Sequence, residues 1–224
     1  MYRKFFKRLI DIILSFVGLV VLTPVWIIFF IWIKLDSKGP ILFTQNRVGK
    51  NKEIFKIHKY RTMKISTPKD TPTHLLENPE QYITRAGKFM RKTSIDELPQ
   101  ICDIFIGKMT IIGPRPALWN QDDLIAERDK YKDKNGKSVN DLVPGLTGWA
   151  QINGRDELEI EVKAALDGEY LEKISLWTDI KCFFGTILSV LKTDGVVEGG
   201  TGELAKAETV MADVDADTTE VEKN

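Results

Sequence analysis

The chain has 224 residues, a length that fits one domain or one domain with an appendage, and it is long enough to bury a core without disulfides. Its 32 basic and 32 acidic side chains cancel, and a charged fraction of 29% with a mean hydropathy of -0.17 excludes a polytopic membrane protein. Cys102 and Cys182 lie far apart with no CxxC pattern, which argues against a disulfide framework, zinc site or redox motif and favours a reducing, cytoplasmic compartment.

The neutral total conceals three segments of different charge. Residues 1–64 hold 13 Lys/Arg against 3 Asp/Glu, residues 65–197 hold 17 against 21, and residues 198–224 hold 2 against 8. The last segment also lacks apolar periodicity, so we expect a disordered acidic tail.

An apolar segment opens the chain, from Leu9 to Ile33, with Asp11 as its one charge. As a straight helix it would measure about 37 Å, enough to cross a hydrocarbon core of about 30 Å. The segment is too long for a cleaved signal peptide, and no small-x-small cleavage site follows it, so we expect a retained anchor.

Two features of this segment bear on its topology. Basic residues flank both ends, which places both on the cytoplasmic side by the positive-inside rule. Pro24 lacks the N–H of a helical bond, so it predicts a kink or break, where the hydroxyl of Thr23 could satisfy a freed carbonyl. These residues favour a kinked spanning helix and a re-entrant helix equally, and a helix buried in a soluble core less.

The remaining pattern predicts an α+β fold, mainly helical with a small β-hairpin. The final helix is apolar enough to serve equally as core or as a membrane-interface helix. In chain order we expect strands at 40–48 and 54–60, a loop at 65–80, helices near 83–90 and 98–105 with a stop at Gly107, Pro/Gly loops at 113–116 and 144–155, and helices beginning near 158 and 176.

Adjacent carboxylates, Asp96 and Glu97, directly follow a basic stretch that includes Arg91. They are suited to binding a divalent cation together with an anionic ligand. The sequence alone favours a simpler interpretation, a capping box formed by Ser94 and Glu97, although Pro99 weakens it.

Candidate phosphate-binding cations lie elsewhere in the chain. Prolines flank Arg115 in GPRP and would stiffen the backbone that presents its guanidinium. Arg155 ends a Gly-rich loop, while Lys59 and Arg61 alternate along a strand end and would face either one cleft or solvent. Nucleotide-binding glycine motifs, HExxH and GxSxG are missing from the sequence, and its two histidines lie in different contexts, which leaves carboxylate and arginine chemistry.

Several motifs in fixed order resemble the bacterial sugar transferases, also called monotopic phosphoglycosyl transferases, over residues 2 to about 195. The chain looks like the minimal form of that family. The motifs are KRLIDIILS, TPVW, GPILFTQNRVG, FKIHKYRTM, RAGKFMRKTSIDELPQ, GKMTIIGPRP and PGLTGWAQINGR.

The resemblance implies an Mg²⁺-dependent enzyme that moves a sugar 1-phosphate from a UDP-sugar to polyprenyl phosphate, typically undecaprenyl phosphate, and releases UMP. It would initiate exopolysaccharide, capsule or glycoconjugate assembly at the cytoplasmic face of the bacterial inner membrane. A homo-oligomer is compatible with it, and no nucleic-acid partner is expected. The implied organisation is a re-entrant anchor at 1–38, a cytoplasmic transferase domain at 39–197 with interfacial helices, and the tail at 198–224.

The resemblance also assigns roles to individual residues. Asp96 and Glu97 would be the catalytic pair: Asp96 would be the nucleophile that forms an aspartyl phosphosugar, and Glu97 would help the acceptor phosphate attack. Both would contact Mg²⁺, and Thr23-Pro24 would break the helix where the family has Ser-Pro. Departures are Asp103 for the usual Asn, Lys108 for Asp and Thr110 for Ser. Arg115 matches the family's phosphate-holding arginine, with Lys59, Arg61, Arg91 and Arg155 as weaker candidates.

Two other functions fit parts of this pattern. A membrane-bound Mg²⁺-dependent phosphohydrolase would use the same carboxylates with water as acceptor. A non-catalytic scaffold of a glycan-assembly complex would use the basic N-terminal region and the acidic tail for recruitment.

Overall fold

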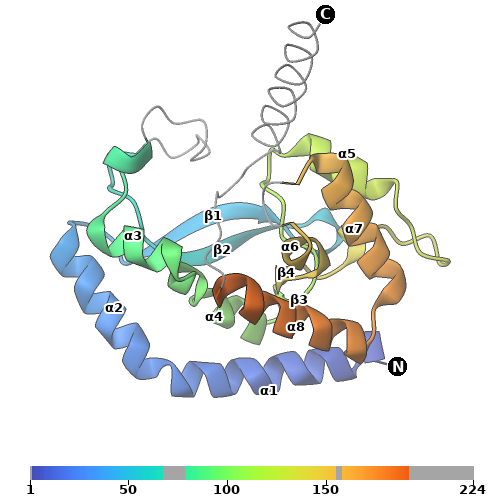
Figure 1. The fold of residues 1–224 in the computed structure, drawn as a ribbon, viewed down its shortest axis with the longest axis horizontal. Helices are drawn as coiled ribbons and strands as arrows, with labels where there is room; N and C mark the ends of the chain where they lie inside the picture. Colours follow the sequence, from blue (N-terminus) through green and yellow to red (C-terminus); the bar gives the residue numbers. More distant parts are fainter. Residues whose placement is uncertain (1, 68–78, 155–157, 192–224) are drawn as a thin grey trace, which may run out of the picture.

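The computed structural model describes residues 2–67, 79–154 and 158–191 (Figure 1). It mixes helices with two small sheets, which confirms the α+β class. The tail and Arg155 lie outside the described residues, and the division into three domains stays a prediction. The elements are α1 Phe6–Val21, α2 Thr23–Asp36, β1 Leu42–Val48, β2 Ile54–Tyr60, α3 Arg85–Lys92, α4 Gln100–Phe105, β3 Thr110–Ile112, α5 Asp122–Asp129, β4 Gly145–Thr147, α6 Trp149–Ile152, α7 Ile160–Lys173 and α8 Leu176–Leu191.

The expected hairpin is confirmed. β1 and β2 pair antiparallel in a register that sets Leu42 opposite Tyr60 and Val48 opposite Ile54. Tyr60 is buried in a cluster with Phe29 of α2 and Met90 of α3, so one end of the hairpin is fixed against both helices. The predicted helices at α3, α4, α7 and α8 are also present.

The N-terminal apolar segment is broken where the sequence predicts it. α1 and α2 meet at a bend of 60°, and Pro24 lies in the first turn of α2. Thr23 Oγ1 donates a 2.8 Å hydrogen bond to the carbonyl of Leu19, the expected role of this hydroxyl. Among the described residues, no single helix is long and apolar enough to cross a bilayer, whereas this bent pair together meets that criterion.

α1 inverts the side-chain distribution of a soluble helix. Its two buried residues are polar, Asp11 and Ser15, whereas apolar residues such as Phe16 and Val20 are more than half exposed. Large apolar side chains are normally the ones removed from water. The alternative of a helix buried in a soluble core is therefore wrong for α1.

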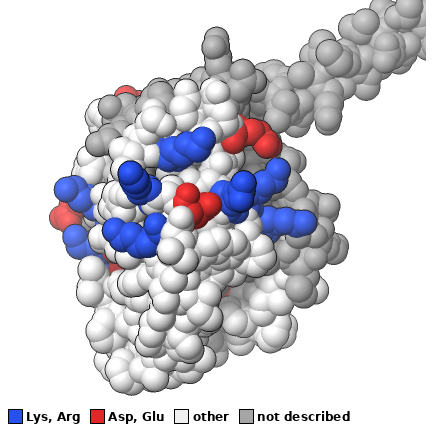
Figure 2. Space-filling model, turned by 90° about the vertical axis from the view of Figure 1, so that its left-hand side faces the viewer, with Lys and Arg blue, Asp and Glu red and all other residues white. Residues whose placement is uncertain are grey.

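Charge is segregated on the face formed by α2 and α3. Figure 2 shows Lys and Arg in a band around acidic groups, with the surface below the band almost free of charge. The exposed basic residues at the end of α2 and along α3 are Lys34, Lys38, Arg85, Lys88 and Lys92.

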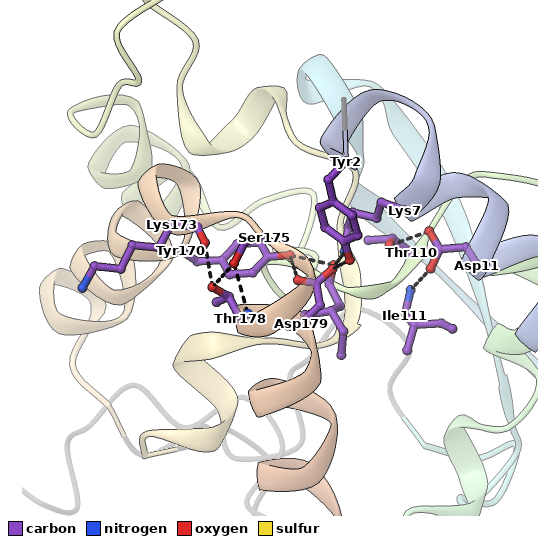
Figure 3. A network of polar contacts seen from close by, with 11 residues as sticks. Tyr2, Lys7, Asp11, Thr110, Ile111, Tyr170, Lys173, Ser175, Thr178 and Asp179 are labelled. Carbon is purple, nitrogen blue, oxygen red and sulfur yellow. Dashed lines mark hydrogen bonds and ion pairs between the residues drawn. The ribbon is translucent and has the colours of Figure 1, made fainter.

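A polar network joins the start of the chain to α8, the last helix among the described residues (Figure 3). Asp179 of α8 accepts hydrogen bonds from Tyr2 and Tyr170 and forms an ion pair with Lys7. Burial, together with the charge of Asp179, raises the pKa of Tyr170 far above its usual range, so its hydroxyl stays a donor. The network therefore fixes the N-terminal end of α1 to the globular part.

Asp11 extends this attachment along α1. Its carboxylate accepts hydrogen bonds from Thr110 Oγ1 at 2.7 Å and from the amide of Ile111 at 3.0 Å (Figure 3). The one charge of the apolar segment is thus used to dock α1 on β3, which explains how a carboxylate is accommodated at this position.

A second, parallel sheet pairs β3 with β4 and joins the two Pro/Gly loops. A Cβ on Gly145 would lie 2.2 Å from the amide nitrogen of Gly113, so this approach requires glycine. The prediction of one loop over 144–155 is wrong in part, because it contains β4 and the short helix α6. Three-residue strands are too short to leave a periodic pattern.

α5 was not predicted because its sequence, DDLIAERD, carries no apolar stripe. It is placed by tertiary contacts instead: Leu124 of α5 packs with Ala164 of α7 and Val48 of β1. α7 and α5 thereby form the side of the fold farthest from α2 (Figure 1).

Candidate active site

Asp96 and Glu97 lie on a single 3₁₀ turn, Ile95–Glu97, between α3 and α4. The capping-box interpretation is wrong: Ser94 has a left-handed backbone with φ of 55° and makes no side-chain cap bond, and α4 begins only after Pro99. A capping serine needs an extended backbone, which Ser94 lacks. The two carboxylates are therefore presented by a tight turn, and their position needs an explanation other than helix capping.

Glu97 is the meeting point of two cations. Its Oε1 lies 2.8 Å from Arg115 Nη2 and 3.0 Å from Lys59 Nζ. Burial alone would raise the pKa of Glu97, but the guanidinium of Arg115 and the ammonium of Lys59 outweigh it and hold that pKa well below its usual range. Glu97 is therefore ionised at neutral pH, next to the buried Asp96, which is 5% exposed.

The two cations reach this point from separate elements. Lys59 points from β2 with its side chain 8% exposed, and Arg115 extends from the loop after β3 with its side chain 26% exposed. The expectation that Lys59 and Arg61 share a cleft or face solvent together does not hold. Arg61 follows the end of β2 and donates to the carbonyls of Ser37 and Lys38 at 2.8 and 2.5 Å.

Arg91 lies on α3, where its Nε donates a 3.0 Å hydrogen bond to Thr62 Oγ1. The structure thus brings Lys59, Arg115 and Glu97 together at the turn that carries Asp96. Arg61 instead donates to backbone carbonyls, and Arg91 donates to a hydroxyl group. A donor-pocket role for Arg61, Arg91 and Arg155 stays a prediction.

Asp103, one of the departures from the family pattern, has a defined partner. It is fully buried on α4, accepts a 3.0 Å hydrogen bond from the amide of His58, and lies 2.8 Å from His58 Nδ1. It therefore holds β2 one residue before Lys59. The sequence places Asp103 near the dyad, but it gives no sign of this contact with the hairpin.

The carboxylates of Asp96 and Glu97 are the candidate ligands for Mg²⁺. No group of three or more His, Cys, Asp or Glu side chains suited to a metal is found within 2–67, 79–154 and 158–191. Mg²⁺ commonly uses only one or two carboxylates and completes its sphere with water and substrate phosphates. Asp96 and Glu97, neighbours on one 3₁₀ turn, supply two carboxylates, which is the number that this mode of binding needs from the protein.

Comparison with known proteins identifies the family. A sequence model described as bacterial sugar transferase matches residues 2–193. A UDP-glucose:undecaprenyl-phosphate glucose-1-phosphate transferase of Escherichia coli K12 is 37% identical over 192 residues, which cover 83% of this chain and 40% of that protein. An undecaprenyl-phosphate galactose phosphotransferase of Salmonella typhimurium is 31% identical over 207 residues, covering 86% of this chain and 42% of that protein.

The chain thus spans about two fifths of the length of these two relatives. An uncharacterized sugar transferase of Bacillus subtilis 168, EpsL, is closer in size: it is 35% identical over 191 residues, which cover 85% of this chain and 89% of EpsL. On the family match and this coverage, the chain belongs to the bacterial sugar transferase family.

Proposed function

We propose that the chain transfers a sugar 1-phosphate from a UDP-sugar to undecaprenyl phosphate or a related polyprenyl phosphate. The observation that carries this proposal is the convergence of Arg115 and Lys59 on Glu97, beside the buried carboxylate of Asp96. Two fixed cations at one partly buried point form a site for phosphate oxygens, and in the structure the carboxylate of Glu97 holds them there.

The proposed reaction proceeds in two displacements at one phosphorus atom. An oxygen of Asp96 bonds to the β-phosphorus of the UDP-sugar while the bond from that phosphorus to the bridging oxygen breaks, and UMP leaves with the electron pair. A phosphate oxygen of the polyprenyl phosphate then attacks the same phosphorus, which releases Asp96 as carboxylate. Covalent catalysis of this kind divides one difficult step into two.

Arg115, Lys59, Glu97 and Asp96 have different electrostatic roles in this reaction. Arg115 and Lys59 hold phosphate oxygens whose charge would otherwise oppose the approach of the anionic Asp96. Mg²⁺, held by Asp96 and Glu97, would supply further neutralisation of phosphate charge. Glu97 keeps both cations directed at the site until phosphate arrives.

The test uses the purified full chain with Mg²⁺, a panel of UDP-sugars and undecaprenyl phosphate, and it measures UMP release. We expect release that depends on the lipid, and Asp96→Asn should lower the rate at least about a thousandfold. Full activity of Asp96→Asn overturns the nucleophile assignment. Release of sugar phosphate in the absence of lipid would favour the phosphohydrolase. If the folded wild-type protein is inactive on every donor, both enzymatic functions are rejected and the non-catalytic scaffold is favoured.

Membrane attachment at the cytoplasmic face of the inner membrane belongs to the same proposal. Apolar side chains are exposed along three helices: Ile13, Phe16, Val17, Val20 and Val21 of α1, Ile27, Ile28, Ile31 and Leu35 of α2, and Trp177, Phe183, Phe184 and Leu188 of α8. Large apolar side chains exposed on three helices favour contact with lipid. The band of Lys and Arg above it suits an anionic leaflet (Figure 2).

A re-entrant arrangement of α1 and α2 is testable by labelling. Cysteines introduced as Arg3→Cys and Lys38→Cys should both resist an impermeant thiol reagent in intact cells and react after permeabilisation. Labelling of one position from outside would reject the re-entrant arrangement in favour of a spanning helix.

A further inference from the structure

The loop that carries Arg115 is held at every carbonyl from residue 114 to residue 117. Each of these four consecutive groups accepts a hydrogen bond from a different residue elsewhere in the fold. The pairs are Pro114 with the amide of Gly145 at 2.8 Å, Arg115 with Arg128 Nη2 at 3.0 Å, Pro116 with Arg47 Nη1 at 3.0 Å, and Ala117 with the amide of Val48 at 2.9 Å.

Two of these donors are side chains, and the better buried is Arg128. Arg128 on α5 is 4% exposed and its partner Asp167 on α7 is 1% exposed. Arg128 directs Nε at 2.9 Å and Nη2 at 2.5 Å to Asp167 Oδ2, and the same Nη2 donates to the carbonyl of Arg115. One planar guanidinium therefore joins α5, α7 and the loop.

This arrangement is a costly way to stabilise a fold. Burying two opposite charges often stabilises no better than apolar residues of similar volume. Asp167 Oδ1 also has no hydrogen-bond partner within the described part of the chain, and burial raises the pKa of Asp167 against the opposing charge of Arg128. What an apolar pair at these positions could not supply is the third contact, the hydrogen bond to the carbonyl of Arg115.

We propose that Arg128, oriented by Asp167, is a positioning residue for the phosphate-binding Arg115. It fixes the backbone of Arg115, whose guanidinium then reaches the Glu97 carboxylate at 2.8 Å. The two flanking prolines limit the backbone of the loop but leave its carbonyls without local donors, so the direction of Arg115 depends on groups outside the loop. This inference rests on the proposed function for the role of Arg115.

The first test is a double-mutant cycle on kcat/KM for UMP release. Arg128→Lys removes the planar fork that contacts Asp167 and the loop together, and we expect a loss of about ten- to a hundredfold. In an Arg115→Lys background the same substitution should cost less than about twofold, because its effect passes through Arg115. Equal losses in both backgrounds would show a general structural role and overturn the proposal.

Asn140→Ala is the matched control. Asn140 donates to the carbonyl of Ile125 on α5 at 2.8 Å and to Asp129 at 2.9 Å, so its loss loosens α5 without touching the loop. We expect a lower unfolding temperature for this variant, with kcat/KM per folded protein unchanged. A loss of kcat/KM like that of Arg128→Lys would count against positioning.

Amide hydrogen exchange gives a readout that does not need activity. Peptides covering residues 110–120 should exchange faster in Arg128→Lys than in wild type, and not in Asn140→Ala. If the loop exchanges faster in Arg128→Lys but the wild-type protein is inactive, the proposed function is rejected, while the contact by which Arg128 fixes the loop is supported. Unchanged exchange with an active wild type rejects the positioning role alone.

Discussion

The hydroxyl of Tyr2 donates a 2.6 Å hydrogen bond to Asp179 Oδ2, which joins the first described residue to α8 (Figure 3). Lys7 pairs with the same oxygen, and Tyr170 donates to Oδ1 at 2.7 Å. One buried carboxylate thus anchors the start of α1. Because α1 exposes many of its apolar residues, this polar contact helps to set where the helix lies on the globular part, together with the bonds of Asp11 to β3 and the packing of α1 against α4.

Asp179→Ala should therefore destabilise the chain strongly. It leaves two hydroxyl donors and a lysine without their acceptor, and we expect a loss of about 1–3 kcal/mol in the free energy of unfolding. Urea titration of the purified protein measures it. The control is Lys173→Met, which breaks the exposed pair with Glu169 and should change stability by less than about 0.5 kcal/mol. Equal losses would refute a special role for the network.

Glu97→Gln should reduce the acid sensitivity of the protein. Burial opposes ionisation of Glu97, but Arg115 and Lys59 lower its pKa in the folded state, so its charge stabilises the fold above the ordinary carboxyl pKa. That contribution declines as pH falls from about 5 toward the depressed value. We expect Glu97→Gln to be less stable than wild type at pH 7 and to converge with it at low pH.

Thermal unfolding at a series of pH values measures this difference. Glu80→Gln is the control, because Glu80 is 81% exposed in its pair with Lys88 and should leave the profile unchanged. A gap between wild type and Glu97→Gln that stays constant from pH 7 into acid contradicts the role assigned to this charge.

Both cysteines should be slow to react in the folded protein. Burial, followed by the charge of Asp179, raises the pKa of Cys182 to about 12, and burial with Asp103 raises the pKa of Cys102. Few thiolates then form at pH 8. Mass spectrometry after iodoacetamide treatment should find little modification of native protein and full modification in denaturant. Rapid native alkylation of the fully buried Cys182 would contradict this packing.

Gly145→Ala should disturb the approach of the two Pro/Gly loops. The new Cβ would meet backbone atoms of Gly113 at 2.2 and 2.5 Å, and we expect a destabilisation of about 1–3 kcal/mol with reduced activity. Gly18→Ala in α1 is the comparison, because its Cβ would meet only Ile101 side-chain atoms at 3.6 Å or more. That change should be neutral or stabilising by up to about 1 kcal/mol. Unfolding midpoints measure both effects, and equal midpoints for Gly145→Ala and Gly18→Ala would contradict the close approach at Gly145.

The elements that local pattern specifies were predicted correctly. Pro24 lacks an N–H, and the helix bends there; alternation on either side of Gly49 produces the hairpin; apolar spacing produces α3, α4, α7 and α8. The pair of carboxylates at Asp96 and Glu97 is also recognisable from the sequence, because the two residues are neighbours in the chain. Each of these signals acts within a few residues of its own position.

Only the tertiary structure decided which charges meet. Lys59, Glu97 and Arg115 come from a strand, a turn and a loop, and nothing in their spacing distinguishes them from Arg61, whose guanidinium turns to backbone carbonyls. β3, β4 and α5 leave no periodic pattern, because they are short or lack an apolar stripe, and pairing and burial place them instead. The sequence by itself determined the groups able to carry phosphate chemistry, and long-range contacts determined which of them gather at one site.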